Sequence, residues 1–346
     1  MNRSDSDAAA MLLPMITGHV VSRLIYAATV AGVVDALGEE EKKYDAIAQA
    51  THSDGEALLR LLRALVTVGL AREPTPGRFC AAPQAAPLRS NSTNSLRNLV
   101  LMHGAERSWR SWEHMPYSLR TGRPASNELY GTSGFDYFEH NADAAAVFHA
   151  AMAEVSASMA SAIVAAYDFS QHASIADIGG GDGMLLSRVL AAAPNARGTL
   201  FDLPHALRRA EQRLAAAGQQ DRCDIVAGDF FEAIPPGRHA YLLKNILHDW
   251  DDERCLAILG TLRRAMAPES QAFVIERIVP PQIEARPEHR QVAMMDLGML
   301  VIAGGRERTQ AQFGALLQRT SLRMLGEPIR LGGAFPCAML RIQRSA

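Results

Sequence analysis

In the second half of the chain, short apolar runs alternate with helical patterns of apolar residues. The runs span residues 174–178, 197–202, 224–227, 239–244 and 271–277. Because short buried strands that alternate with helices imply βαβ units, the pattern predicts a parallel sheet with helices on both faces. The region after Gln171 is therefore expected to be a doubly wound α/β domain.

The first hundred residues have a different pattern. Apolar residues recur every three or four positions from Met11 to Leu37, and Tyr44–Thr51 is a second short helix. Asp54 is placed to cap a third helix, and Glu73–Gly77 is a turn between two short strands. Two helices followed by a hairpin predict a winged helix. Residues 90–170 are again helical, except for an irregular stretch at 121–141.

A winged helix can bind DNA, but the charges here do not favour it. Between Glu41 and Cys80, six basic residues stand against five acidic ones, and the whole chain carries a net charge of -2. No basic stripe is available to hold phosphates. A structural or dimerisation role is expected, without nucleic acid.

Cysteine usage and hydropathy indicate a cytoplasmic protein. The four cysteines lie far apart without metal-ligand spacing. Met1–Asp7 lacks the basic and apolar regions of a signal peptide. Apolar stretches such as Leu24–Leu37 are too short or interrupted to span a bilayer, so no membrane association is expected.

A glycine-rich turn follows the first run, at residues 177–183. Gly179, Gly180, Gly181 and Gly183 stand between the strand and a helix that opens at Met184. Glycines let a ligand approach the backbone, and the helix N-terminus favours an anionic group. The dinucleotide fingerprint requires glycine at position 184, so the spacing argues against a nicotinamide cofactor.

Acidic residues follow the next two strands. Asp202 ends the second run, where a carboxylate can accept hydrogen bonds from ribose hydroxyls, although it can also cap a helix. Asp229 follows the third run beside Phe230, an arrangement that suits an exocyclic amine and a purine ring. A simple turn is the alternative for Asp229.

His248 lies just after the fourth run, at the same expected sheet edge. A histidine takes a proton from a hydroxyl near neutral pH, and an orienting carboxylate assists it. Glu276 ends the fifth run, and Glu307 follows Gly304-Gly305, so either glutamate can serve. A solvated loop histidine is the alternative.

The ordered motifs DIGGGDG, FDLP, GDFF, LKNILHDWDD, ERIVPP and GGRERT resemble those of class I O-methyltransferases of the plant caffeate type and of bacterial natural-product biosynthesis. The resemblance implies a Rossmann-like domain with a mostly parallel seven-stranded sheet at 171–346. It also implies a helical linker to the substrate pocket at 101–170 and a winged-helix dimerisation domain at 1–100. The implied cofactor is S-adenosyl-L-methionine (SAM), which leaves as S-adenosyl-L-homocysteine (SAH), without a metal.

The resemblance carries roles to individual residues. Asp177, Gly179, Gly180 and Gly181 correspond to the turn that holds the methionyl part of the cofactor. Asp202 with Leu203 corresponds to the ribose-binding acid, and Gly228 with Asp229 and Phe230 corresponds to the adenine contacts. Lys244 corresponds to a cofactor-binding lysine. His248 corresponds to the catalytic base, and Glu276 and Glu307 correspond to the acids that orient it.

An acceptor pocket is expected between the domains, lined by methionines and aromatic side chains that suit a flat apolar ring. The candidates, which can equally be core residues, are Met102, His103, Trp109, Phe138, Phe148, Met152, Met295, Asp296 and Met299. The expected reaction is methylation of a hydroxyl on an aromatic natural product such as a phenazine or a polyketide. N-methylation, a non-methylating SAM-dependent reaction and a ligand-sensing winged-helix regulator are the alternatives.

Overall fold

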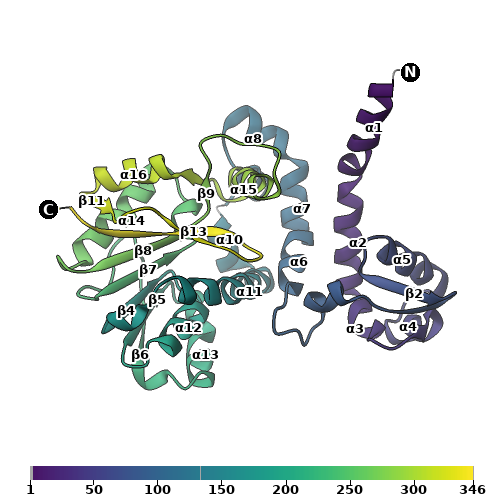
Figure 1. Cartoon of the computed structure of the whole chain (residues 1–346), viewed down its shortest axis with the longest axis horizontal. Coiled ribbons are helices and arrows are strands. Elements are labelled where there is room, and N and C mark those ends of the chain that lie inside the picture. The colour runs from purple at the N-terminus through teal and green to yellow at the C-terminus, as the bar shows by residue number, and fades with distance from the viewer. Residues whose placement is uncertain (1–2, 133, 346) are drawn as a thin grey trace. The chain divides into compact units, whose positions relative to one another are not determined.

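The computed structural model describes residues 3–132 and 134–345, and the chain divides into two compact units, Met1–Trp109 and Arg110–Ala346 (Figure 1). The expected linker at residues 101–170 contributes to both units. The division of the chain at residues 100 and 170 stays a prediction. Every predicted cofactor and catalytic residue belongs to the second unit.

The first unit contains the expected helices and hairpin. Its helices are α1 (Arg3–Ile16), α2 (Gly18–Val30), α3 (Val33–Leu37), α4 (Tyr44–Ala50), α5 (Gly55–Thr67) and α6 (Arg97–Gly104), with a 3₁₀ segment at Pro83–Leu88. A three-stranded antiparallel sheet has the order β1 (Lys42–Lys43), β3 (Arg78–Ala81), β2 (Ala71–Thr75). The Ala57 N–H donates to Asp54 Oδ1 at 2.8 Å, which confirms the predicted cap of α5.

The core of the first unit forms where α5 packs on its neighbours. Leu58, Leu62 and Leu65 share one face of α5, because they stand three or four residues apart, and all three are buried. They cluster with Ile47 of α4 and Phe79 of β3. The predicted two-helix-and-hairpin arrangement is confirmed.

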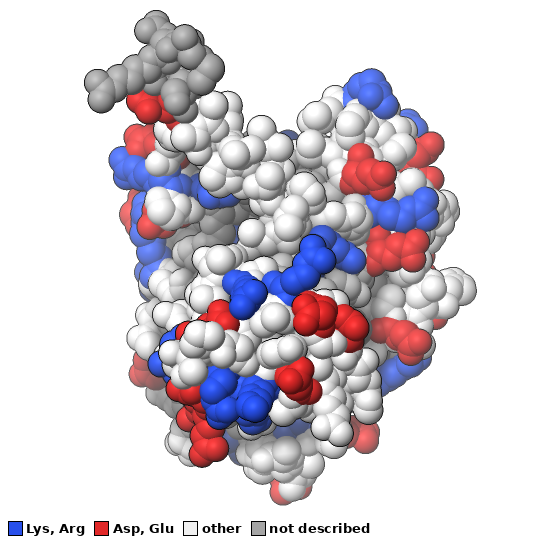
Figure 2. Space-filling view, turned by 90° about the vertical axis from the view of Figure 1, so that its right-hand side faces the viewer, with Lys and Arg blue, Asp and Glu red and all other residues white. Residues whose placement is uncertain are grey.

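Two arginines of the predicted winged helix are paired with acidic side chains. Arg63 pairs with Glu73 at 3.7 Å, and Arg78 pairs with Glu41 at 3.5 Å. On the face drawn in Figure 2, basic and acidic side chains lie near one another, and uncharged surface separates these groups. The structure therefore offers no support for a phosphate-binding stripe there.

Two helical stretches, Asp7–Val30 and Ala142–Ala166, have the length and hydropathy of a membrane span, which differs from the prediction. A buried core helix or an interface helix meets the same criteria. In the second stretch, 33% of the most apolar window is buried, and the helix packs against α12. The first stretch is exposed in the single chain, where its apolar side chains Met11, Leu12, Leu13, Met15, Ile16, Val20 and Val21 are 41–69% exposed.

The second unit begins with a helical region that follows α7 (Glu106–Glu113). Its helices are α8 (Met115–Thr121), α9 (Ala125–Tyr130), α10 (Gly134–His140) and α11 (Ala142–Ala166). The stretch predicted to be irregular, 121–141, instead contains α9 and α10. Both are short, and Gly131 in the left-handed conformation ends α9, so their apolar spacing gives little signal.

The five predicted strands form the parallel part of one sheet. They are β4 (Ser174–Ile178), β5 (Arg197–Asp202), β6 (Cys223–Ala227), β7 (Ala240–Lys244) and β8 (Gln271–Glu276), in the spatial order β8-β7-β4-β5-β6. Antiparallel β13 (Cys337–Arg344) extends the sheet beyond β8. The sheet has eight strands rather than seven, because both β11 (Leu322–Met324) and β12 (Ile329–Leu331) pair with β13.

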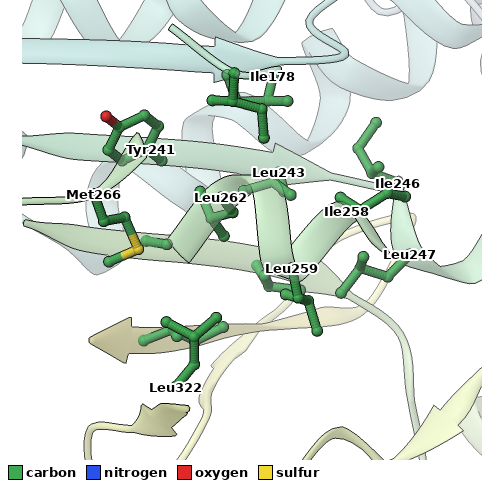
Figure 3. Close-up of a cluster of buried hydrophobic side chains, with 14 of the residues drawn as sticks. Ile178, Tyr241, Leu243, Ile246, Leu247, Ile258, Leu259, Leu262, Met266 and Leu322 are labelled. Atoms are coloured by element: carbon green, nitrogen blue, oxygen red, sulfur yellow. The ribbon is translucent and has the colours of Figure 1, made fainter. Parts of the chain in front are cut away.

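Helices cover both faces of this sheet. On one face, α14 (Asp252–Ala265) and α16 (Gln310–Arg319) bury a large apolar cluster in which Ile258, Leu259 and Leu262 meet Leu243 of the sheet (Figure 3). On the other face lie α12 (Met184–Ala192) and α13 (Ala210–Ala216), with α11 against α12 (Figure 1). Asp251 caps α14 by accepting from the Arg254 N–H at 2.8 Å.

The remaining segments follow β8. A small parallel pair joins β9 (Ile278–Val279) to β10 (Arg308–Thr309), and α15 (Pro287–Gly298) continues into a π-helical turn at Met299–Ala303. Since parallel strands end at the same edge, the motifs after β4, β5, β7 and β8 gather there.

Candidate active site

The glycine-rich turn after β4 is shaped by contacts that exclude side chains. Gly179 and Gly181 have φ of +67° and +59°. A Cβ on Gly179 would lie 2.4 Å from Ile246 Cδ1, and one on Gly180 would lie 2.5 Å from Leu200 Cδ1. Glycine is therefore required for this turn, which leaves its backbone bare.

Asp202 ties the end of β5 to the glycine turn. Its Oδ2 accepts from the Gly181 N–H at 2.8 Å, and its Oδ1 accepts from the Leu203 N–H at 2.7 Å. Burial raises the pKa of Asp202, and these two hydrogen bonds oppose that rise. Each carboxylate oxygen keeps a second lone pair for a ligand hydroxyl.

The residues after β6 lie beside the same turn. Phe230 Cε1 is 3.7 Å from the position of a Gly179 Cβ. Asp229 Oδ1 accepts from the Phe231 N–H at 2.8 Å, and the rings of Phe231 and Trp250 meet edge to face at 4.9 Å. An aromatic wall thus borders the turn, next to an acid. Gly228 is also required, because its Cβ would lie 2.6 Å from the Phe201 ring.

A buried acid and a partly buried base, Asp177 and Lys244, lie at the ends of β4 and β7. Burial raises the pKa of Asp177 to about 7 and lowers that of Lys244, and each charge opposes the other group's shift. Asp177 Oδ2 has no hydrogen-bond partner within residues 3–132 and 134–345. This unsatisfied oxygen and the bare turn beside it fit a polar ligand such as the amino-acid end of SAM.

His248 lies in the short 3₁₀ turn Leu247–Asp249, just after β7, and is 6% exposed. Its Nδ1 is 3.1 Å from Glu307 Oε1 and 3.7 Å from Glu276 Oε2. Its Nε2 is 3.6 Å from Asp249 Oδ1. The structure thus brings the three predicted catalytic residues together, and adds Asp249.

The two glutamates hold different parts of the loop. Glu276 Oε1 accepts from the backbone N–H groups of Ile246, Leu247 and His248 at 3.0, 2.8 and 3.4 Å. Glu307 instead makes the shorter contact with the imidazole ring. Glu276 therefore anchors the backbone, and Glu307 orients the side chain.

The surrounding charges set the protonation of His248. Burial lowers its pKa, but Glu276, Asp249 and Glu307 together outweigh this and raise it to about 9. Burial raises the pKa of Glu276 to about 7, against the opposing effect of His248. The imidazole therefore holds its proton more tightly than an exposed histidine.

The same three side chains have donor atoms of the kind that bind a metal ion, all within 4.8 Å of one another. However, Arg277 Nη1 lies 3.6 Å from Glu307 Oε1 and already neutralises part of the negative charge. The 3.1 Å separation of His248 Nδ1 from Glu307 is that of a hydrogen bond. His248 and Glu307 are thus placed to share a proton.

The predicted acceptor residues fall into both units. Met102, His103 and Trp109 belong to the first, where Arg23 lies over the Trp109 ring at 4.8 Å. In the second unit, Phe138 and Phe148 stack at 4.5 Å. The others in that unit are Met152, Met295, Asp296 and Met299.

Asp296 has a partner within the second unit. Its Oδ1 accepts from the Glu307 N–H at 2.8 Å, so it supports the backbone of an acid that contacts His248. Asp249, which the predicted site omitted, is a partly buried carboxylate whose pKa burial raises. Its position directly after His248 in the sequence could have indicated that it belongs to the site.

Two family models match the chain. An O-methyltransferase domain covers residues 90–323, and an O-methyltransferase dimerisation domain covers residues 13–89. The chain belongs to this O-methyltransferase family. It is therefore a SAM-dependent enzyme, which confirms the predicted class and fold and sets aside the regulator.

Individual relatives agree with this assignment. The phenazine O-methyltransferase PhzM of Lysobacter antibioticus is 39% identical over 308 residues, which cover 89% of each chain. A phenazine-1-carboxylate N-methyltransferase of Pseudomonas aeruginosa is 31% identical over 319 residues, or 92% of this O-methyltransferase and 93% of the relative. The structure of CalO1, a methyltransferase in calicheamicin biosynthesis, in its SAH-bound form matches 100% of both chains at 32% identity with a TM-score of 0.85.

Proposed function

We propose that this enzyme transfers the methyl group of SAM to a hydroxyl of an aromatic natural product of the phenazine or polyketide type. The observation that carries the proposal is the buried His248, held at Nδ1 by Glu307 and placed at the sheet edge that also carries the glycine turn. A base in that position serves an acceptor that must lose a proton.

The cofactor residues are assigned from their neighbours. The turn at Gly179–Gly181, with Asp177 and Lys244 below it, holds the amino-acid end. Asp202, beside Leu203, accepts from the ribose hydroxyls, because both of its oxygens keep free lone pairs. Asp229, after Gly228, accepts from the adenine amine beside the Phe230 ring.

SAM supplies an activated methyl group on a sulfonium. The chain's task is to align the acceptor and remove its proton. With Nδ1–H donating to Glu307, His248 presents the Nε2 lone pair to the acceptor hydroxyl, whose pKa is about 10 in a simple phenol. Glu307 then stabilises the imidazolium, and Glu276 keeps the loop in place.

The acceptor side is proposed from the aromatic and methionine residues of the second unit. The stacked Phe138 and Phe148 and the two methionines one helical turn apart, Met295 and Met299, offer flat apolar contacts for a ring. Met152 remains a candidate for this surface, and Met102, His103 and Trp109 of the first unit stay predictions from the sequence. Asp296 acts through Glu307 rather than on the acceptor.

N-methylation is the second candidate, since a relative of that activity matches 92% of the chain. A comparison of paired acceptors distinguishes O-methylation from N-methylation. Hydroxyphenazines and aminophenazines with the same ring system are incubated with methyl-labelled SAM, and mass spectrometry identifies the labelled products. We expect label on the hydroxyl compounds. Label on the amines alone would overturn the proposal.

The pH dependence follows from the raised pKa of His248. A base must be neutral, so kcat/KM should rise as the pH increases through about 9. Glu307→Gln removes a carboxylate that raises this pKa, and the rise should move to lower pH by about one unit. Because the same acceptor is used for both proteins, its own ionisation cancels in the difference. A rise of kcat/KM at an unchanged or a higher pH in Glu307→Gln would contradict the assignment of His248 as the base.

We propose that the exposed apolar face of α1 and α2 is covered by a second copy of the chain, because the dimerisation model begins at residue 13 on this face. Leu12→Glu combined with Ile16→Glu places two charges on the face and should yield monomers by light scattering. Arg60→Glu, an exposed change of equal charge on α5, is the control and should remain dimeric. A dimeric double variant would place the interface elsewhere.

A further inference from the structure

The loop that carries His248 is backed by a second segment, Gly304–Arg308. The Arg306 N–H donates to the His248 carbonyl oxygen at 2.8 Å. A Cβ on Gly305 would lie 1.9 Å from that same oxygen and 2.4 Å from the Asp249 carbonyl carbon. Two backbones thus touch directly behind the proposed base, and glycine is required for their approach.

Arg308 joins this segment to both ends of the His248 turn. Its side chain is fully buried. Its Nη1 donates to the Leu247 carbonyl oxygen, and its Nη2 donates to the Trp250 carbonyl oxygen, each at 2.8 Å. These carbonyls lie on either side of His248 and Asp249. The guanidinium therefore spans the turn from which both side chains project.

The same guanidinium is anchored by an acid on the neighbouring helix. Arg308 Nε and Nη2 donate to Asp252 Oδ1 at 3.0 and 2.8 Å, at the start of α14. A lysine could keep this ion pair, but its single ammonium cannot supply the planar set of donors that also reaches two carbonyls. The contacts with Leu247 and Trp250 thus require arginine in particular.

We propose that Arg308 is a positioning residue that holds the His248 turn at the distance where Glu307 can orient the imidazole. Glu307 directly precedes Arg308, so one strand end supplies both the acid on the ring and the clamp on the backbone. This inference rests on the proposed role of His248 as the base. Displacing a reacting group by about 1 Å can cost on the order of 100-fold in rate.

Arg308→Lys tests the clamp, and Arg306→Lys is its matched control. Arg306 also pairs with Asp252, at 3.2 Å, but its side chain is 46% exposed and makes no contact with the two carbonyls among the interactions described. We expect kcat to fall on the order of 10–100-fold in Arg308→Lys, with the cofactor Kd changed by less than about twofold. The rise of kcat/KM with pH should move to lower pH, because the imidazole lies farther from Glu307.

Arg306→Lys should keep the wild-type rate and pH profile. Equal losses in the two variants, or a normal rate and an unshifted rise of kcat/KM in Arg308→Lys, would overturn the inference. If Arg308→Lys does not fold by circular dichroism, Asp252→Ala replaces it, since Asp252 is 43% exposed and the change removes the acceptor that anchors Arg308, together with the exposed pair to Arg306. A wild-type rate in Asp252→Ala would also overturn the inference. Absence of methyl transfer by the wild-type enzyme would instead reject the proposed function.

Discussion

His248→Ala should reduce kcat by about 10²–10⁴-fold, the range that a positioned general base contributes. The imidazole contacts Glu307 and faces Glu276 and Asp249, so its loss removes the only histidine that these three described acids surround. The cofactor Kd should stay nearly unchanged, because the proposed SAM contacts come from other residues. Steady-state turnover and calorimetric titration with SAM measure the two quantities.

His239→Ala is the matched control. His239 is exposed at the other end of β7, where its ring contacts Ser174 Oγ at 2.8 Å. Its loss should leave kcat unchanged.

Acceptors with more acidic hydroxyls should depend less on His248, since they ionise without help. Turnover within a few-fold of wild type in His248→Ala, for an ordinary phenol, would remove His248 from the mechanism.

Asp202→Ala should weaken SAM binding on the order of 100-fold, while the chain stays folded. Two hydroxyls that donate to one carboxylate each lose a charged hydrogen bond of about 1.5–3 kcal/mol, part of which water recovers. The change also frees the Gly181 N–H, which Asp202 holds at 2.8 Å, and so loosens the glycine turn. Both effects act on the same ligand, so the cofactor Kd is the sensitive measure.

Asp224→Ala serves as the control for this variant. Asp224 lies on the adjacent strand β6 in an exposed pair with Arg197 at 3.9 Å, which contributes little to stability. Its cofactor Kd and thermal midpoint should match those of the wild type. A normal SAM affinity in Asp202→Ala would show that the ribose is held elsewhere.

Local sequence patterns were sufficient to predict the parallel strands. β4 and β5 have the predicted bounds, since each is a short apolar run closed by a turn signal. The two short strands at the edge of the sheet, β11 and β12, were not predictable, because both depend on pairing with β13, which follows them in sequence. In a run of only three residues, pairing with another strand leaves little pattern in the sequence.

The candidate site also has parts that the sequence predicted and parts that it did not. The glycine spacing and the placement of Asp202 and His248 after strands predicted which residues meet. The sequence could not separate the tasks of Glu276 and Glu307, because that depends on which carboxylate faces a ring and which faces three amides. Arg308 gave no signal either, since its partners are backbone carbonyls of another segment.

The position of β4 in the sheet has a consequence for how such an enzyme can diversify. β5 and β6 lie on one side of β4, and β7 and β8 lie on the other. The first side carries the proposed nucleoside contacts, and the second carries the proposed proton-transfer groups. Changes to His248 and the acids around it can therefore alter or abolish the chemistry and leave cofactor binding in place, whereas Lys244 on the same side serves the cofactor as well. A lineage with this sheet has a folded, ligand-binding intermediate between one reaction and another.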